Sequence, residues 1–152
     1  MQSQRHLIVL LAGWTARCLT VFALAAVSLS AGASENLYDT QFGGKAGMQK
    51  IVSDTIARSL ADPRISDFFA DADISRLEAV VAEQLCELTG GPCKYSGKSM
   101  REAHKDFAIR TAHFNYFAEH LQAAMRAQGV PNWAQNRLLA KLAPMHRDIA
   151  RP

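Results

Sequence analysis

Several motifs of common enzyme and metal chemistry are missing from this 152-residue chain. It has no H-E-x-x-H or C-x-x-C pattern, so neither a zinc hydrolase nor a structural zinc site is supported. The absence of C-x-x-C-H gives no indication of covalent c-type haem attachment. No G-x-S-x-G marks a nucleophilic serine. Basic runs are also absent, so the sequence does not indicate a nucleic-acid partner.

Acidic residues are missing from residues 1–33, which instead contain Arg5, Arg17 and two apolar runs, LIVLLAGW and CLTVFALAAVSLS. The stretch ends in Ala31-Gly32-Ala33, immediately before the polar Ser34. A basic start, an apolar middle and a small-residue exit predict a secretory signal peptide over residues 1–33. An uncleaved membrane anchor is the alternative, although Arg17 interrupts the ~20 apolar residues that a span needs. We expect export to the periplasm, with no stable membrane contact after cleavage.

Cysteine is scarce, and only Cys86 and Cys93 would remain after cleavage. In an oxidising compartment such a pair commonly becomes a disulfide. The Gly90-Gly91-Pro92 turn between them can bring their Cα atoms within the ~4.4–6.8 Å that a disulfide needs. Two free cysteines are the alternative, with Cys86 packed as a small apolar residue and Cys93 exposed.

Alternating apolar and polar residues, the pattern of a strand, are missing from the rest of the chain. Apolar residues instead recur at spacings of three and four, which is typical of amphipathic helices. Asp73 and Ser99 are predicted N-caps, and Pro131 suits the first turn of the last helix. We therefore predict an all-α domain with helices over residues 45–60, 73–88, 100–105, 111–128 and 131–149.

Four histidines lie beyond the first 33 residues: His104, His113, His120 and His146. No two of them are four residues apart, so they do not form a helical zinc pair. His113 and His120 share a predicted helix, and we interpret both as partly buried helix residues. His104 differs because it lies on a short helix after a long polar loop, although spacing alone does not make it a ligand.

Five stretches occur in a fixed order: LYDTQFGG, LADPRISDFF, ISRL, GGPCKYSGKSMREAH, and AHF followed by GVP. Together they resemble the group I truncated haemoglobins, a small bacterial and protist globin family, over residues 36–149. The resemblance implies a truncated globin domain over residues 34–152, folded as a two-over-two helical sandwich. It also implies a non-covalent b-type haem, iron protoporphyrin IX, as cofactor.

The resemblance assigns roles to particular residues. His104, in SMREAH, matches the proximal iron ligand, whose second ring nitrogen needs an acceptor to fix the tautomer. His113 matches a structural position, Phe69 the phenylalanine that packs on the haem face, and Phe117 a pocket-lining position. Leu85 and Met100 are further pocket candidates. Cations and a phenol can meet haem propionates, for which the candidates are Arg76, Tyr95 and Lys98, with solvated surface side chains as the alternative.

The sequence departs from the family pattern on the distal side, where the gas would bind. Many members have Phe-Tyr, whose hydroxyl binds dioxygen, where this chain has Thr55-Ile56. Leu77 occupies the usual gate, and Val81 stands where a glutamine is common. Gln84 lies one turn further on, in place of an aromatic residue. No histidine lies on the predicted distal helix, so an internal sixth iron ligand is not indicated.

These observations predict a globin that reversibly binds a diatomic gas: oxygen, nitric oxide or carbon monoxide. A hydrogen bond to bound dioxygen is worth roughly 1.5–3 kcal/mol, and its loss changes an equilibrium constant by about tenfold to 150-fold. The alternative is a haem-dependent redox enzyme, such as a nitric oxide dioxygenase or a peroxidase, working with an unidentified reductase. Since only Gln84 and Thr55 are polar on the distal side, gas binding is favoured. A haem-free helical interaction module is a third hypothesis.

Overall fold

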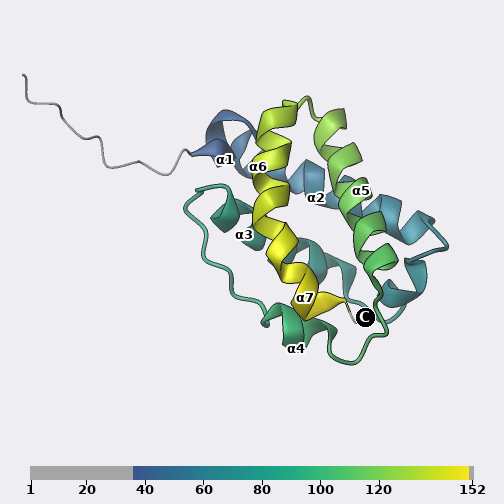
Figure 1. Ribbon diagram of the computed structural model, residues 1–152. Helices are drawn as coiled ribbons and strands as arrows, with labels where there is room; N and C mark the ends of the chain where they lie inside the picture. The colour runs from purple at the N-terminus through teal and green to yellow at the C-terminus, as the bar shows by residue number, and fades with distance from the viewer. Residues whose placement is uncertain (1–35, 151–152) are drawn as a thin grey trace, which may run out of the picture. The chain divides into compact units, whose positions relative to one another are not determined.

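Residues 36–150 are described by the computed structural model, and they form helices joined by turns and loops (Figure 1). No strand occurs among these residues, which confirms the predicted all-α class. The predicted signal peptide lies outside the described residues. In chain order the elements are α1 (Leu37–Thr40), α2 (Gly44–Ala61), η1 (Ser66–Phe69), α3 (Ile74–Leu88), α4 (Met100–His104), α5 (Thr111–Ala127), α6 (Asn132–Leu142), η2 (Ala143–Met145) and α7 (His146–Ile149).

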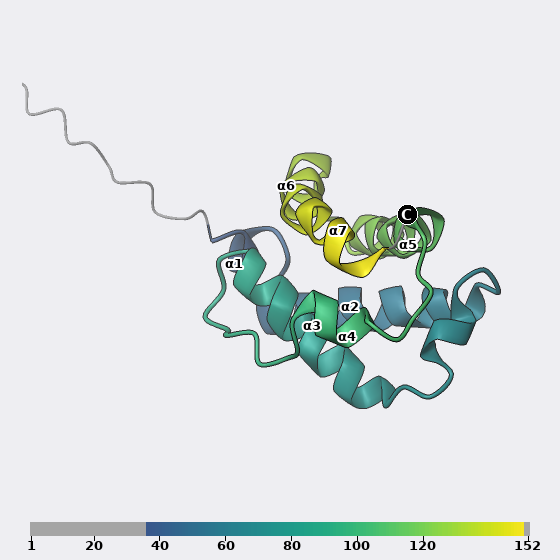
Figure 2. The same ribbon diagram turned by 60° about the horizontal axis from the view of Figure 1, so that its bottom comes forward.

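Two layers of helices make up this part of the chain. Figure 2 shows α2, α3 and α4 in one layer and α5, α6 and α7 in the other. The most extensive contacts join α2 to α5 across the layers and α2 to α3 within one layer. Helix α7 follows α6 and touches α4. The arrangement confirms the predicted two-over-two sandwich.

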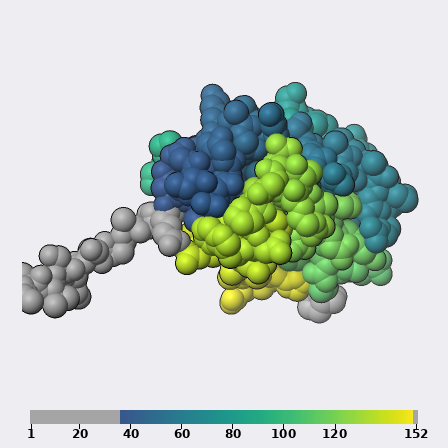
Figure 3. Space-filling view, turned by 90° about the horizontal axis from the view of Figure 1, so that it is seen from above, coloured from purple at the N-terminus to yellow at the C-terminus, as the bar shows by residue number. Residues whose placement is uncertain are grey.

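The apolar core lies where α2 meets α5, and its residues recur at the predicted helical spacing. Met48, Ile51 and Ile56 of α2 are each 0–1% exposed, and Leu121 and Met125 of α5 are 2% and 0% exposed. Full burial of one such side chain contributes about 1.5–3 kcal/mol to folding. On the outside, the surface of α1 and early α2 meets that of the α5–α6 corner (Figure 3). Burial of the facing apolar sides of α2 and α5 therefore fixes how the two layers stack.

Two helix starts agree with their predicted caps. The Asp73 side chain accepts a hydrogen bond from the Arg76 N–H at 3.1 Å and so caps α3. Ser99 and Glu102 form a reciprocal capping box at the start of α4. Hydrogen bonds from Ser99 lower the pKa of the Glu102 carboxyl. The short α4 is thus fixed at its N-terminal end by local contacts.

The last predicted helix differs from the structure in two respects. Pro131 is the N-cap of α6 and not a residue of its first turn. A single helix to residue 149 was wrong, because the 3-10 turn η2 interrupts it at Pro144, which has no N–H for the helical ladder. Two large apolar side chains of the helices point to the surface, since Trp133 of α6 is 48% exposed and Leu60 of α2 is 41% exposed. Helix α1 was not predicted, since a single turn is too short for a periodic pattern.

The sharp corner after α3 depends on two glycines. Gly90 has φ of +85°, a left-handed conformation that costs glycine little. Gly91 is constrained by space, because a Cβ there would lie 2.6 Å from the Cys86 Sγ and 2.7 Å from the Tyr38 ring. The double glycine therefore lets the chain reverse tightly against the end of α3.

A charged cluster anchors the end of α2 to α5. The buried Asp62 carboxylate accepts hydrogen bonds from the Arg64 guanidinium at 2.6–3.0 Å and lies 3.1 Å from His120 Nε2. Hydrogen bonds from Arg64 hold the pKa of Asp62 well below its usual range. The Arg64 guanidinium also stacks over the Tyr116 ring, 3.8 Å from its centroid. This cluster ties the connector after α2 to the opposite layer.

Candidate functional site

Both layers contribute to one apolar cavity of about 560 Å³, a volume common for small-molecule and cofactor sites. Ten of the predicted site residues line it: Ile56, Phe69, Leu77, Val81, Gln84, Leu85, Tyr95, Met100, His104 and Phe117. The fold therefore brings together predicted residues that are far apart along the chain, from α2, η1, α3, the connection after α3, α4 and α5.

Arg76 and Lys98, two of the propionate candidates, do not line the cavity. Arg76 immediately precedes Leu77 on α3, and neighbouring helix residues point about 100° apart, so only Leu77 faces inward. Lys98 is exposed, and its carbonyl oxygen accepts a hydrogen bond from the Tyr95 hydroxyl at 2.7 Å. Because propionates would lie at the pocket rim, the assignment of Arg76 and Lys98 to them stays a prediction.

Several lining residues were missed by the sequence-based assignment. The periodic pattern had placed some of them on apolar faces, but it could not distinguish a residue that fills the core from one that borders a cavity. Others, in the connectors, carry no periodic signal. The missed residues are Val52, Ile65, Phe68, Ala72, Val80, Ala103, Phe107, Ile109, His113, Phe114, Ala118, Leu121, Leu139, Leu142, Ala143, Met145 and Ile149, whereas Thr55 was placed on the distal side and lines the cavity.

His104 enters the cavity from the single turn of α4. Its Nδ1 lies 2.7 Å from the Met100 carbonyl oxygen. Because a carbonyl oxygen can only accept, Nδ1 carries the proton, and a neutral ring then keeps a lone pair on Nε2. That lone pair is the donor that an imidazole offers to iron. Met100 therefore supplies the tautomer-fixing partner that the sequence did not reveal.

His113 has a structural contact in addition to its place on the cavity wall. Its Nδ1 accepts a hydrogen bond from the Arg110 N–H at 3.2 Å, at the start of α5. Its ring also packs on Phe68, with centroids 4.9 Å apart. These contacts agree with the structural role that the family resemblance implied. The position beside the cavity was not anticipated.

The other two histidines lie outside the cavity lining. His146 Nε2 is 3.1 Å from the Thr111 hydroxyl, and its ring packs edge-on against Phe114. His120 lies between Asp62 and Ser59, at 3.1 Å from each, which has the composition of a hydrolase triad. Ser59, however, is 0% exposed and does not border the cavity, so it cannot act as a nucleophile. Within residues 36–150, no cluster of three or more His, Cys, Asp or Glu could hold a metal ion.

The polar side chains on the distal side are already engaged. The Thr55 hydroxyl donates to the Ile51 carbonyl oxygen, one turn back on α2, at 2.7 Å. The Gln84 amide nitrogen lies 3.5 Å from the Met100 sulfur and 3.8 Å from the Met145 sulfur. The remaining predicted distal residues, Ile56, Leu77 and Val81, are apolar. No described distal residue therefore offers a free hydrogen-bond donor.

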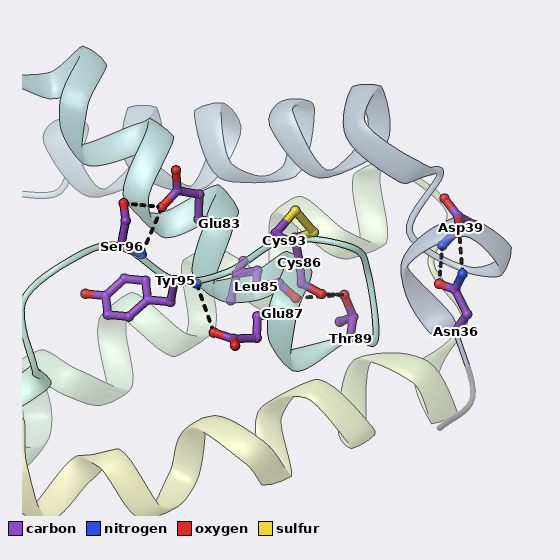
Figure 4. Close-up of a disulfide and its surroundings, with 10 residues drawn as sticks. All are labelled: Asn36, Asp39, Glu83, Leu85, Cys86, Glu87, Thr89, Cys93, Tyr95 and Ser96. Carbon is purple, nitrogen blue, oxygen red and sulfur yellow. Dashed lines mark hydrogen bonds between the residues drawn. A yellow bond between two sulfur atoms is a disulfide. The ribbon is translucent and has the colours of Figure 1, made fainter. Parts of the chain in front are cut away.

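A disulfide joins Cys86 at the end of α3 to Cys93 in the following connection, with Cα atoms 5.8 Å apart (Figure 4). Cys86 is 1% exposed, whereas Cys93 is half-buried. The bond encloses the Gly90-Gly91-Pro92 turn. In the chain-entropy model, closing such a short loop contributes about 2–3 kcal/mol of stability.

The sequence and the fold both match known globins. The bacterial-like globin family matches residues 36–151. The chain belongs to this family. The group 1 truncated hemoglobin GlbN of Mycolicibacterium paratuberculosis is 33% identical to this globin over 115 residues, which span 76% of this chain and 84% of the relative.

Solved structures of truncated haemoglobins share the fold of this globin. The truncated hemoglobin of Tetrahymena pyriformis, in its Fe(III) form, matches with a TM-score of 0.71 and 29% identity, over 74% of this chain and 97% of that one. The 2/2 hemoglobin of a Synechococcus species, in the cyanomet state with covalently attached heme, matches with a TM-score of 0.70 over 75% and 97% of the chains. At 24% identity, this second likeness shows the fold alone. The predicted family and fold are confirmed, and this globin belongs to a haem-binding class.

Proposed function

We propose that this globin holds a non-covalent b-type haem in its cavity and reversibly binds a diatomic gas. The observation that carries the proposal is the geometry of His104. Its Nδ1–H is fixed by the Met100 carbonyl oxygen, and its ring borders an apolar cavity between the helical layers. When bound, the haem iron would supply the position at which the gas is held.

The described residues fit a porphyrin. The cavity of about 560 Å³ is lined mainly by aliphatic and aromatic side chains, which favour burial of a large flat hydrophobic ring. Phe69 and Phe117 supply apolar aromatic surface toward that space. His104 would ligate the iron, and the Met100 carbonyl would hold its ring in the required tautomer.

The chemistry of the other lining residues supports non-covalent attachment. Cys86 and Cys93 are bonded to each other, and residues 36–150 contain no further cysteine. Apart from His104, His113 is the one histidine among the described residues of the cavity wall, and it accepts a hydrogen bond from Arg110. We therefore propose that no side chain is bonded to the porphyrin, unlike the covalently attached heme of the Synechococcus protein.

The apolar distal side bears on which gas is held. Bound dioxygen carries partial superoxide charge and gains roughly 1.5–3 kcal/mol from a distal hydrogen bond. Ile56, Leu77 and Val81 have no donor, and the Thr55 hydroxyl is bonded within its own helix. Dioxygen would therefore be held weakly, whereas nitric oxide and carbon monoxide depend less on polar contacts.

A redox enzyme, such as a nitric oxide dioxygenase or a peroxidase, is less well supported. Peroxidase chemistry needs a distal group that accepts and returns a proton. Thr55 donates to the α2 backbone, and Gln84 is directed to two methionine sulfurs. Neither residue titrates near neutral pH, so neither can act as that proton carrier. No described residue identifies a reductase.

We also propose that the chain is exported to the periplasm, with residues 1–33 removed as a signal peptide. No helix within residues 36–150 is both long and apolar enough to span a bilayer. The N-terminal sequence and the Cys86–Cys93 pair support export.

The mature protein from the periplasmic fraction should begin at Ser34. A chain of full length in the membrane fraction would instead support the uncleaved anchor.

Replacing His104 with Ala should remove the iron ligand and greatly reduce haem retention. The haem content of the purified protein, from its Soret absorbance per chain, measures this effect. His113→Ala is the matched control, because His113 also borders the cavity but caps α5, and it should keep most of its haem. Normal haem content in His104→Ala together with loss in His113→Ala would reverse the assignment.

Replacing Ile56 with Tyr should place a hydroxyl over the iron and slow dioxygen release. Ile56→Phe is the matched control, since it adds a ring of similar size without the donor. Stopped-flow measurement should give a release rate about tenfold to 150-fold slower for Tyr than for Phe, the range expected for one hydrogen bond. Equal rates in two variants that both retain haem would show that residue 56 does not face the ligand.

A further inference from the structure

The connection between α3 and α4, residues 90–99, runs back along α3 and is attached to it at several points (Figure 4). We call this segment the strap. Cys93 is bonded to Cys86 of α3. Both the N–H and the hydroxyl of Ser96 donate to one carboxylate oxygen of Glu83, at 3.1 and 2.6 Å. The strap is therefore held along the last turns of α3.

A further backbone contact lies between the disulfide and Ser96. The Tyr95 N–H donates to the Glu87 carboxylate at 3.0 Å. Such hydrogen bonds to a charged acceptor are stronger than neutral ones. Hydrogen bonds from Ser96 lower the pKa of the Glu83 carboxyl, so this acceptor is ionised at neutral pH. The disulfide and the two carboxylates thus act together on the same strap.

The strap leads directly into the short helix that carries His104. It ends at Ser99, the N-cap of α4, and α4 is a single turn that ends at His104. A helix this short has little stability of its own, so its position depends on its attachments. On the far side, Arg101 forms an ion pair with Asp148 of α7. His104 is therefore held between the strap and α7.

The two cysteines of the disulfide differ in exposure. Cys86 is 1% exposed and is covered by Gly91 and Tyr38, which leave no room even for a methyl group at position 91. Cys93 is half-buried and lies in the non-helical strap. Of the two, Cys93 is therefore the cysteine at which an external thiolate would attack, with Cys86 as the leaving group.

We propose that Cys93 is a site of thiol–disulfide exchange, and that breaking the bond to Cys86 loosens the strap and the hold of His104 on the haem. A thiolate of a dithiol reductant would bond to the Cys93 sulfur, and Cys86 would leave as a thiolate and take up a proton. The second thiol of the reductant would then displace Cys93, so the dithiol ends as a disulfide and both cysteines as thiols. The link to haem rests on the proposed function.

The expected effect is partial, because the Glu83 and Glu87 contacts persist after reduction. For a loop this short, the chain-entropy model gives an upper limit of roughly 30- to 150-fold in the equilibrium. With two anchors remaining, we expect haem loss to accelerate by about tenfold on reduction.

The test compares haem transfer from the loaded protein to excess apomyoglobin, with and without a dithiol reductant. Wild type should lose haem about tenfold faster once thiol titration shows two free thiols per chain. The variant Cys86→Ser with Cys93→Ser should lose haem fast under both conditions. Glu83→Gln should accelerate the loss further in reduced protein, whereas Glu119→Gln, an exposed carboxylate on α5, should not.

A second readout needs no haem. In the apoprotein, amide hydrogen exchange of residues 101–104 should become faster on reduction, whereas that of the buried part of α2 should not. Unchanged haem transfer and unchanged exchange in fully reduced wild type would overturn the proposal. If oxidised wild type never holds haem, the proposed function fails. Faster exchange of residues 101–104 on reduction would then show that the disulfide affects the position of α4 but not haem binding.

Discussion

The hydrogen bond from His104 Nδ1–H to the Met100 carbonyl oxygen is the contact on which the rest of the site depends. At 2.7 Å it fixes the ring and its tautomer, and the lone pair of Nε2 remains for a metal. Both partners belong to a single helical turn, which cannot hold itself in place. The strap, the capping box at Ser99 and the ion pair between Arg101 and Asp148 therefore contribute to the position of His104, and Tyr95 of the strap also lines the cavity.

The cavity has one candidate iron ligand, His104, and a lining that is otherwise mainly apolar. By the family resemblance, Ile56 and Val81 stand where many members place a tyrosine and a glutamine, and both line the cavity. The hydroxyl of Thr55 and the amide of Gln84 are engaged with neighbouring atoms, so neither substitutes for the missing donor. The site is therefore suited to a small neutral ligand and poorly suited to stabilising negative charge on that ligand.

The elements predicted from sequence were those specified by local signals. Apolar spacing and caps at Asp73 and Ser99 were sufficient for α2, α3, α4 and α5. The break at Pro144 was overlooked because apolar residues continue in register on both sides of it. The contact of Glu83 with Ser96, thirteen residues away, has no sequence signature. Arg76 was assigned by charge, and its direction became clear only from the position of α3 relative to the cavity.

Resonance Raman spectroscopy of the ferrous, unliganded protein tests the central claim most directly, because it reports the bond between iron and its protein ligand. A neutral imidazole on one face and an apolar distal side predict five-coordinate, high-spin haem with an iron–histidine stretching band. His104→Ala should lack that band even when haem is supplied in excess. A six-coordinate, low-spin spectrum would contradict the account, since it would require a second protein ligand on the side described here as apolar.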